Sequence, residues 1–161
     1  MSSPVPPTSN PSDFDKTHIR HAILQAQIGF QEGGVPIGGA LVTADGVVVG
    51  VGRNRRVQKG SAIRHGETDC LENIGRLPAK MYQGCTMFTT LSPCTMCTGA
   101  ILLFGIKRVV MGENTTLVGG EQILRDAGVE LVNLDLSECK DMMAKFIAAK
   151  PGVWREDIGE K

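Results

Sequence analysis

The stretch CTMFTTLSPCTMCTGAILLF occupies residues 85–104 and joins two different side-chain patterns. Residues 85–91 are rich in β-branched and aromatic side chains, which is typical of a strand. Residues 94–104 follow almost at once and predict a helix. A strand that leads directly into a helix is the unit from which α/β sheets are built, so this stretch favours an α/β fold.

The rest of the chain continues this alternation. Before the stretch, the sequence predicts a helix from Ser12 or Asp13 to Gly33-Gly34, strands at 35–44 and 47–53 around an Asp45-Gly46 turn, a polar loop at 54–64 and a helix at 65–74. After it, the sequence predicts a strand at 107–112, a helix at 121–127, a strand at 129–134 and helices at 136–149 and 154–160. This order predicts an α/β layered sandwich that opens with an antiparallel hairpin and continues with crossover units. Residues 1–12 contain four prolines and predict a disordered tail, so we expect a single domain over residues 13–161.

The charge of the chain is balanced. The 17 Lys and Arg residues equal the 17 Asp and Glu residues, so the formal net charge is 0. A protein that binds the phosphate backbone of nucleic acids needs excess positive charge, and an aromatic content of 4% provides few side chains for base stacking. We therefore expect no nucleic-acid partner. No run of apolar residues is long enough to span a bilayer, so we expect no membrane partner either.

The five cysteines are Cys70, Cys85, Cys94, Cys97 and Cys139. An odd number of cysteines in a chain that can form a hydrophobic core favours reduced thiols, some of them metal-binding or catalytic, over a disulfide framework. This usage predicts a cytoplasmic protein, with a nuclear location left open.

Two short motifs carry the chemistry: His65-Gly66-Glu67, and Cys94 and Cys97 within Pro-Cys-Thr-Met-Cys. One imidazole and two thiolates are three ligands that suit Zn²⁺. Each motif is expected to open a helix, where the free amides favour thiolates. A structural zinc ion normally has a fourth protein ligand, so three ligands predict a catalytic site with water in the fourth position.

Glu67 is the candidate proton carrier. At the first turn of a helix, His65 can point toward the metal while Glu67 points toward its water. Zinc with two thiolates is nearly neutral and acidifies water less strongly, which a neighbouring carboxylate base offsets. His-x-Glu followed by Pro-Cys-x-x-Cys is the signature of zinc nucleobase deaminases.

Other residues have simpler interpretations. His18 and His21 lie one turn apart and form either a metal pair or, as we prefer, part of a solvated helix face. Cys70, Cys85 and Cys139 occupy apolar positions and are expected to be inert core thiols. The basic residues of the 53–64 loop form either a nucleic-acid patch or, as we prefer, a solvated loop partly paired with the acidic C-terminus; they are Arg53, Arg55, Arg56, Lys59 and Arg64.

From residue 14 to residue 160, the chain resembles the fungal-type cytosine deaminases, small zinc enzymes of the cytidine and deoxycytidylate deaminase superfamily that act on the free base. The most specific stretches are EGGVPIGG at 32–39, QKGSA at 58–62 leading into His65-Gly66-Glu67, TTLSPC at 89–94 and WREDIGE at 154–160. Other branches of the superfamily share the zinc motifs but not this ending. The resemblance implies a homodimer with one zinc ion per subunit and a three-layer α/β/α sandwich around a mixed five-stranded sheet.

The resemblance also implies a substrate pocket. Asn54 and Asp157 would bind the pyrimidine by hydrogen bonds, with the Gly66 amide and the Ser92 main chain assisting. Ile37, Leu117 and Trp154 would line or cover the ring. The family usually has an aromatic residue in place of Leu117, and often one in place of Arg155.

The expected reaction is the hydrolysis of cytosine to uracil and ammonia. Ring-substituted cytosines are expected to react in the same way, each giving the corresponding uracil. Zinc-activated hydroxide attacks C4 while Glu67 carries protons to N3 and to the leaving amine. The alternatives are a tRNA adenosine deaminase, a guanine or nucleoside deaminase with the same zinc site, and a non-catalytic zinc module. The balanced charge and the acidic ending argue against the first, and Glu67 beside a three-ligand site argues against the last.

Overall fold

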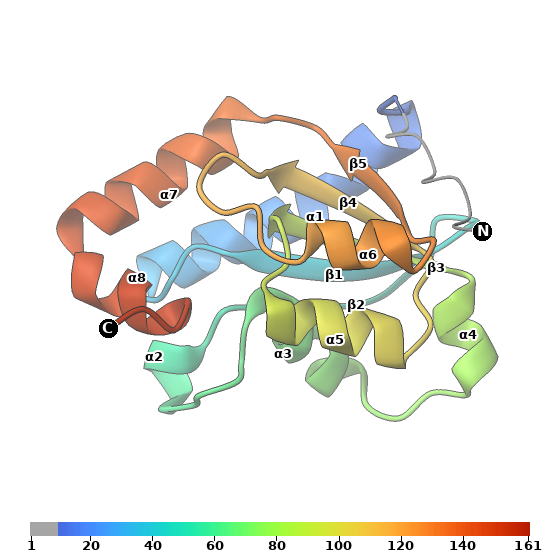
Figure 1. Cartoon of the computed structure of the whole chain (residues 1–161), viewed down its shortest axis with the longest axis horizontal. Coiled ribbons are helices and arrows are strands. Elements are labelled where there is room, and N and C mark those ends of the chain that lie inside the picture. The colour runs from blue at the N-terminus through green and yellow to red at the C-terminus, as the bar shows by residue number, and fades with distance from the viewer. Residues whose placement is uncertain (1–9) are drawn as a thin grey trace.

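The computed structural model describes residues 10–161 (Figure 1). Residues 1–9 of the expected disordered tail lie outside the described residues. Ser12 is the N-cap of α1 (Asp13–Gln31), where its side chain accepts the Asp15 amide while the Asp15 carboxylate accepts the Ser12 amide. This reciprocal capping box satisfies two amides that have no partner within the helix, and it confirms the predicted helix start.

Five strands form one mixed sheet in the order β2-β1-β3-β4-β5. The strands are β1 (Gly38–Thr43), β2 (Val48–Arg53), β3 (Cys85–Leu91), β4 (Arg108–Glu113) and β5 (Glu130–Asn133). Strand β1 pairs antiparallel with β2 and β3, whereas β3, β4 and β5 run parallel. The predicted hairpin and crossover units are therefore confirmed, except that residues 35–37 precede the first strand.

Helices cover both faces of the sheet, as Figure 1 shows. The remaining helices are α2 (Arg56–Lys59), α3 (Gly66–Ile74), α4 (Ala79–Gln83), α5 (Thr95–Leu103), α6 (Glu121–Asp126), α7 (Ser137–Ala149) and α8 (Pro151–Asp157). Side chains from α3, α5 and α6 pack on one face of the sheet, and side chains from α1 and α7 pack on the other. This arrangement confirms the three-layer α/β/α sandwich.

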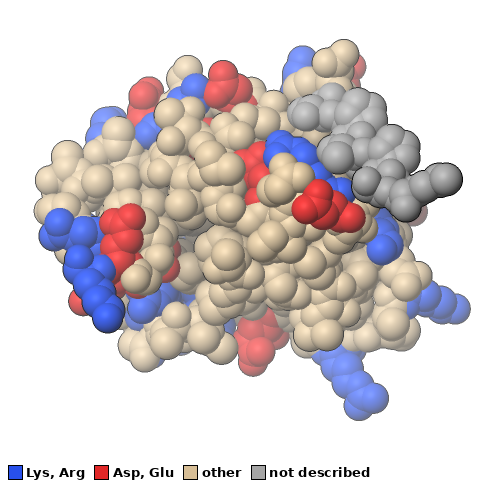
Figure 2. All heavy atoms as spheres, in the orientation of Figure 1, with Lys and Arg blue, Asp and Glu red and all other residues tan. Residues whose placement is uncertain are grey.

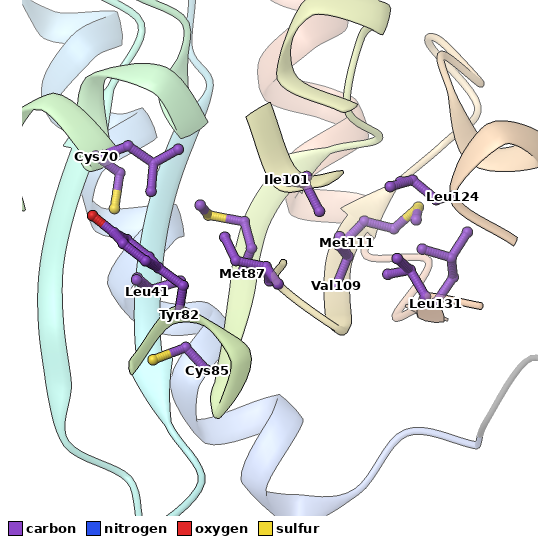
Figure 3. Close-up of a cluster of buried hydrophobic side chains, with 13 residues drawn as sticks. Leu41, Cys70, Tyr82, Cys85, Met87, Ile101, Val109, Met111, Leu124 and Leu131 are labelled. Atoms are coloured by element: carbon purple, nitrogen blue, oxygen red, sulfur yellow. The ribbon is translucent and has the colours of Figure 1, made fainter. Parts of the chain in front are cut away.

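Strand β3 lies in the middle of the sheet and is buried along its whole length. Successive side chains of a strand point to opposite faces, so Met87 belongs to the cluster under α3, α5 and α6, and Phe88 to the cluster under α1. Figure 3 shows Met87 between Leu41 and Met111 in the first cluster. Both faces of this strand are covered, so its residues do not alternate between buried and exposed, and even Thr86, Thr89 and Thr90 are buried.

Three short elements differ from the sequence prediction. Helix α2 lies within the predicted loop 54–64, and α4 precedes β3 where no helix was expected. Helix α8 begins at Pro151 and ends at Asp157, so the predicted range 154–160 was displaced toward the C-terminus. Proline suits the first turn of a helix because its missing amide hydrogen needs no partner there, and this explains the earlier start. None of the described helices is both long and apolar enough to cross a membrane.

Candidate metal centre and active site

Two helix starts meet at the C-terminal end of β3. His65 is the N-cap of α3, and Cys94 is the N-cap of α5, whose first turn carries Cys97. The three potential ligand atoms lie within 4.8 Å of one another, and the Cys94 Sγ lies 3.4 Å from the His65 Nδ1. No other group of three such ligands is found among residues 10–161. The predicted motifs are therefore brought together in space.

The spacing of this cluster fits zinc. Bonds of about 2.3 Å to sulfur and about 2.0 Å to nitrogen in a tetrahedron separate the ligand atoms by roughly 3.5–3.8 Å. His65 and Cys97 are buried, while Cys94 is half-buried at the edge of a pocket. The donor set of one imidazole and two thiols is the set that zinc prefers, so these three residues fit one zinc ion per subunit.

The two thiols have opposite acidities. The hydrogen bond from Cys97 and the one with His65 outweigh burial and lower the pKa of Cys94 to about 4. The same bond to Cys94, together with burial, raises the pKa of Cys97 well above its usual range. Burial opposes protonation of His65, but the contact with Cys94 and the charge of Asp157 raise its pKa to about 9. Both thiols bind zinc as thiolates, and the low pKa of Cys94 favours this form.

Glu67 lies next to the cluster in the first turn of α3 and is 3% exposed. Its Oε1 accepts a hydrogen bond of 2.6 Å from the Thr89 hydroxyl, which extends from the buried strand β3. Burial and the neighbouring Cys94 charge raise the pKa of Glu67, although the Thr89 hydrogen bond opposes this change. A carboxyl group that gains and loses a proton closer to neutral pH suits proton transfer. Thr89 was given no role in the sequence analysis, although a polar residue in a buried strand is a usable signal.

The pocket beside the cluster is small, with a cavity volume of about 10 Å³. Its lining comprises Ile37, His65, Glu67, Leu91, Ser92, Cys94, Leu117, Trp154, Asp157 and Ile158. Five of the predicted substrate-binding residues are among these, namely Ile37, Ser92, Leu117, Trp154 and Asp157. Asn54 does not line the pocket itself but bonds to Asp157, Gly66 is also absent from the lining, and Leu91 and Ile158 were missed. A volume near that of one water molecule is too small for a pyrimidine, so this is a closed conformation.

Helix α8 closes the pocket. Asp157 is buried and accepts a hydrogen bond of 2.7 Å from the Asn54 amide nitrogen. It also lies 3.7 Å from Arg56 and 3.6 Å from the His65 Nε2. Burial raises the pKa of Asp157, although the charge of His65 and the Asn54 hydrogen bond oppose this change. Figure 1 shows α8 beside α2, so distant parts of the chain meet here.

Backbone packs directly on backbone between β1 and the start of α3, the helix that carries Glu67. A Cβ atom at Gly39 would lie 2.7 Å from the Gly66 carbonyl oxygen, and one at Gly66 would lie 3.0 Å from the Gly38 carbonyl carbon. Only glycine allows β1 to approach the start of α3 this closely. Gly66 therefore allows the first turn of α3 to lie against β1, and the contact of its amide with a substrate stays a prediction.

The basic residues of the 53–64 loop are largely paired within the protein. Arg53 forms an ion pair with Glu32, Arg55 and Arg64 both pair with Asp69, and Arg56 approaches Asp157. This confirms only in part the expectation of a solvated loop paired with the C-terminus, since most partners lie on α1 and α3. Such a loop has few free charges for a phosphate backbone.

The other cysteines and the two histidines of α1 lie outside the metal cluster. Cys70, Cys85 and Cys139 are buried free thiols whose pKa burial raises, to about 12 for Cys70 and Cys139, as expected for inert core thiols. The solvated face preferred for His18 and His21 is confirmed only in part. Both are half-buried, their ring nitrogens lie 3.2 Å apart, and the His18 ring packs 4.5 Å from Phe14.

Comparison with known proteins shows to which protein family the chain belongs. Residues 12–113 match the cytidine and deoxycytidylate deaminase zinc-binding region. The chain is 58% identical to the cytosine deaminase of Candida albicans over 146 residues, which cover 91% of this chain and 97% of that protein. It is 34% identical to the tRNA-specific adenosine deaminase of Haemophilus influenzae over 110 residues, covering 67% of this chain and 63% of that protein.

Solved structures share the fold. The guanine deaminase of Nitrosomonas europaea matches with a TM-score of 0.71 at 16% identity, covering 89% of this chain and 90% of that chain. Identity at this level shows the fold alone. The matched zinc-binding region spans more than half of the chain and contains all three ligands and Glu67. The chain therefore belongs to the cytidine and deoxycytidylate deaminase family.

Proposed function

We propose that this chain catalyses the hydrolysis of free cytosine to uracil and ammonia, a step of pyrimidine salvage. One observation carries the proposal: a buried carboxyl group, Glu67, stands beside a three-ligand metal cluster in a pocket that is also lined by Asp157, which is bonded to Asn54. The similarity to the Candida albicans cytosine deaminase supports it, because it covers 91% of the chain against 67% for the tRNA-specific enzyme.

Glu67 carries the protons of the reaction. His65, Cys94 and Cys97 would hold a zinc ion, whose Lewis acidity would help a water molecule to attack C4 at neutral pH. Glu67 accepts one proton of the water and delivers it to N3 of cytosine, then takes the remaining hydroxyl proton and gives it to the amine that leaves C4. Thr89 holds the Glu67 carboxylate in one orientation during these transfers. One water molecule is consumed, and its oxygen becomes the O4 of uracil.

The pocket residues bind and orient the base. The Asn54 side chain offers both a donor and an acceptor, and the Asp157 carboxylate offers acceptors, so together they satisfy the polar edge of a pyrimidine. The Gly66 amide and the Ser92 main chain supply further hydrogen bonds. Ile37, Leu117 and Trp154 cover the ring and exclude water. We expect α8 to open for cytosine and to close again over the bound base, and a ribose on the ring would prevent this second closure, so that the free base is selected, including ring-substituted cytosines.

The test is an ultraviolet assay of the purified, zinc-loaded protein with four substrates: cytosine, cytidine, guanine and a tRNA anticodon stem. We expect only cytosine to be converted. If the RNA or guanine is converted and cytosine is not, the proposal is wrong and the chain is a tRNA adenosine deaminase or a guanine deaminase instead. No conversion of any substrate, with zinc bound, would favour a non-catalytic zinc module.

We also propose a homodimer in the cytoplasm. Ile63 is 62% exposed and Leu103 is 79% exposed, and both line an apolar groove between α3, α4 and α5. In Figure 2 the surface over α5 carries no charged side chains. Exposed apolar surface of this kind is commonly buried between subunits. Light scattering should give twice the mass of the chain, and Leu103→Glu should give the mass of one chain. A monomeric parent protein would contradict the proposal.

A further inference from the structure

Asp69 is a fully buried carboxylate on α3 that the proposed reaction does not use. Its carboxylate accepts three hydrogen bonds: from the Arg53 backbone amide at 3.0 Å, from the Arg55 Nε at 2.9 Å and from an Arg64 guanidinium nitrogen at 2.6 Å. A buried charge is tolerated only when it is paired and hydrogen-bonded, and here two guanidinium groups meet that requirement. These contacts outweigh burial and lower the pKa of Asp69, so it is ionised at neutral pH.

The partners of Asp69 share a position in the sequence. Arg53 and Arg55 are the two neighbours of Asn54, and Arg64 is the residue before His65. Asp69 itself lies in the same short helix as Glu67, two residues further on. One carboxylate thus connects both sides of Asn54 to the helix that carries Glu67.

The surrounding backbone restricts the segment in the same way. The Arg55 amide donates to the Arg64 carbonyl at 2.9 Å, which joins the two ends of the loop. A Cβ atom at Gly52 would lie 2.2 Å from the Cys70 amide nitrogen, so the end of β2 rests directly on α3. The Asn54 backbone amide donates to the Ile37 carbonyl at 2.8 Å, and Asp69 binds the residues on either side of Asn54, the Arg53 amide and the Arg55 side chain.

We propose that Asp69 is a positioning residue that holds Asn54 in register with Glu67, so that a bound pyrimidine presents its reacting carbon correctly. This inference rests on the proposed function, since it assigns Asn54 to substrate binding. A neutral side chain cannot replace the carboxylate. An asparagine would direct an NH₂ group at an arginine and leave two guanidinium groups without a counter-charge.

The test is a double-mutant cycle between Asp69→Asn and Asn54→Ala, measured as kcat and KM for cytosine on zinc-loaded protein. We expect Asp69→Asn to raise KM about tenfold, with a smaller effect on kcat, because one lost or misplaced hydrogen bond has roughly this effect. In the Asn54→Ala background the same substitution should change KM less than twofold, since the group that Asp69 positions is already absent.

Asp15→Asn is the matched control. Asp15 is also a fully buried carboxylate, and it is paired with Arg108 through two hydrogen bonds. Loss of the Asp15 charge should lower the melting temperature and leave KM for cytosine unchanged. If Asp69→Asn does not fold, Arg55→Gln takes its place in the cycle, because Asp69 then keeps the Arg53 amide and Arg64.

The outcomes are distinct. Additive effects of the two substitutions on KM, or a fall in melting temperature with unchanged KM, would show that Asp69 only stabilises the fold and would overturn the inference. A parent protein that binds zinc but does not convert cytosine would instead overturn the proposed function. A coupled effect on KM, absent in Asp15→Asn, supports the positioning role.

Discussion

The Asn54 amide nitrogen donates a hydrogen bond of 2.7 Å to the Asp157 carboxylate, although the two residues are 103 positions apart in the chain. The two side chains proposed to bind the pyrimidine therefore satisfy each other while the pocket is closed. Cytosine must separate them on entry and replace their mutual bond with its own polar groups. Because each buried group always has a partner, opening the pocket for substrate carries a small cost in hydrogen bonds.

This exchange predicts a specific loss in Asp157→Ala. We expect kcat/KM for cytosine to fall about 10- to 100-fold, since Asn54 and the base would each lack a partner. The matched control is Glu156→Ala, an exposed neighbour on the same helix, which should stay within about twofold. Equal activities of the two variants would remove Asp157 from the binding site.

Glu67→Gln separates proton transfer from metal binding. The amide has the same size but carries no proton between water and base, so we expect kcat to fall by about 10²- to 10⁴-fold. Zinc content, measured by atomic absorption, should remain at one ion per chain because the three ligands are unchanged. A zinc-loaded variant with full activity would show that another group carries the protons.

Cys94→Ala tests the metal ligand and the helix cap together. We expect loss of zinc and a lower melting temperature, since binding energy of a metal is also folding energy and the alanine cannot accept the Cys97 amide. Cys139→Ala removes a buried thiol far from the cluster in sequence and should retain zinc. Retention of zinc by Cys94→Ala would require a different ligand set.

The Asp15–Arg108 pair predicts an acid-dependent part of stability. Burial raises the pKa of Asp15, but the Arg108 contacts and the Ser12 hydrogen bonds outweigh it, and the net pKa is lowered. The pair therefore contributes fully above the ordinary carboxyl pKa of about 3.9 and loses its contribution as the pH falls through the lower, folded-state pKa.

In urea unfolding at pH 7, Asp15→Asn should lower the unfolding free energy by about 1–3 kcal/mol. The difference from the parent protein should shrink below about pH 4. The exposed Asp141→Asn on α7 should change the unfolding free energy by less than about 0.5 kcal/mol. A difference that is constant from pH 7 to pH 3 would mean that the charge of Asp15 does not stabilise the fold.

Elements with strong local signals could be predicted from the sequence. Residues 85–91 were placed without error, because a buried central strand is apolar on both faces and ends at a clear break before Ser92-Pro93. The zinc ligands were also identified, since their spacing and their neighbours Pro93 and Glu67 restrict the possible chemistry. The short helices α2 and α4 were missed because tertiary contacts, rather than local periodicity, stabilise such single turns.

Long-range polar partners were not predictable in the same way. Thr89 and Asp69 lie in regular elements, and nothing in their neighbouring residues indicates what they bind. Their partners are brought close by strand pairing and by the loop that ends at Arg64. The pairing of the basic loop with Asp69 and Glu32 likewise depends on the fold, so charge composition alone left its role open.

The contact between Gly39 and Gly66 limits where the pocket can be enlarged. A Cβ at Gly39 would lie 2.7 Å from the Gly66 carbonyl oxygen, and the two residues meet through backbone, which no side-chain substitution removes. We therefore expect variants that accept bulkier bases to arise at the apolar side chains that line the pocket, which are Ile37, Leu91, Leu117, Trp154 and Ile158. Substitutions there leave the proton carrier and the metal ligands in place.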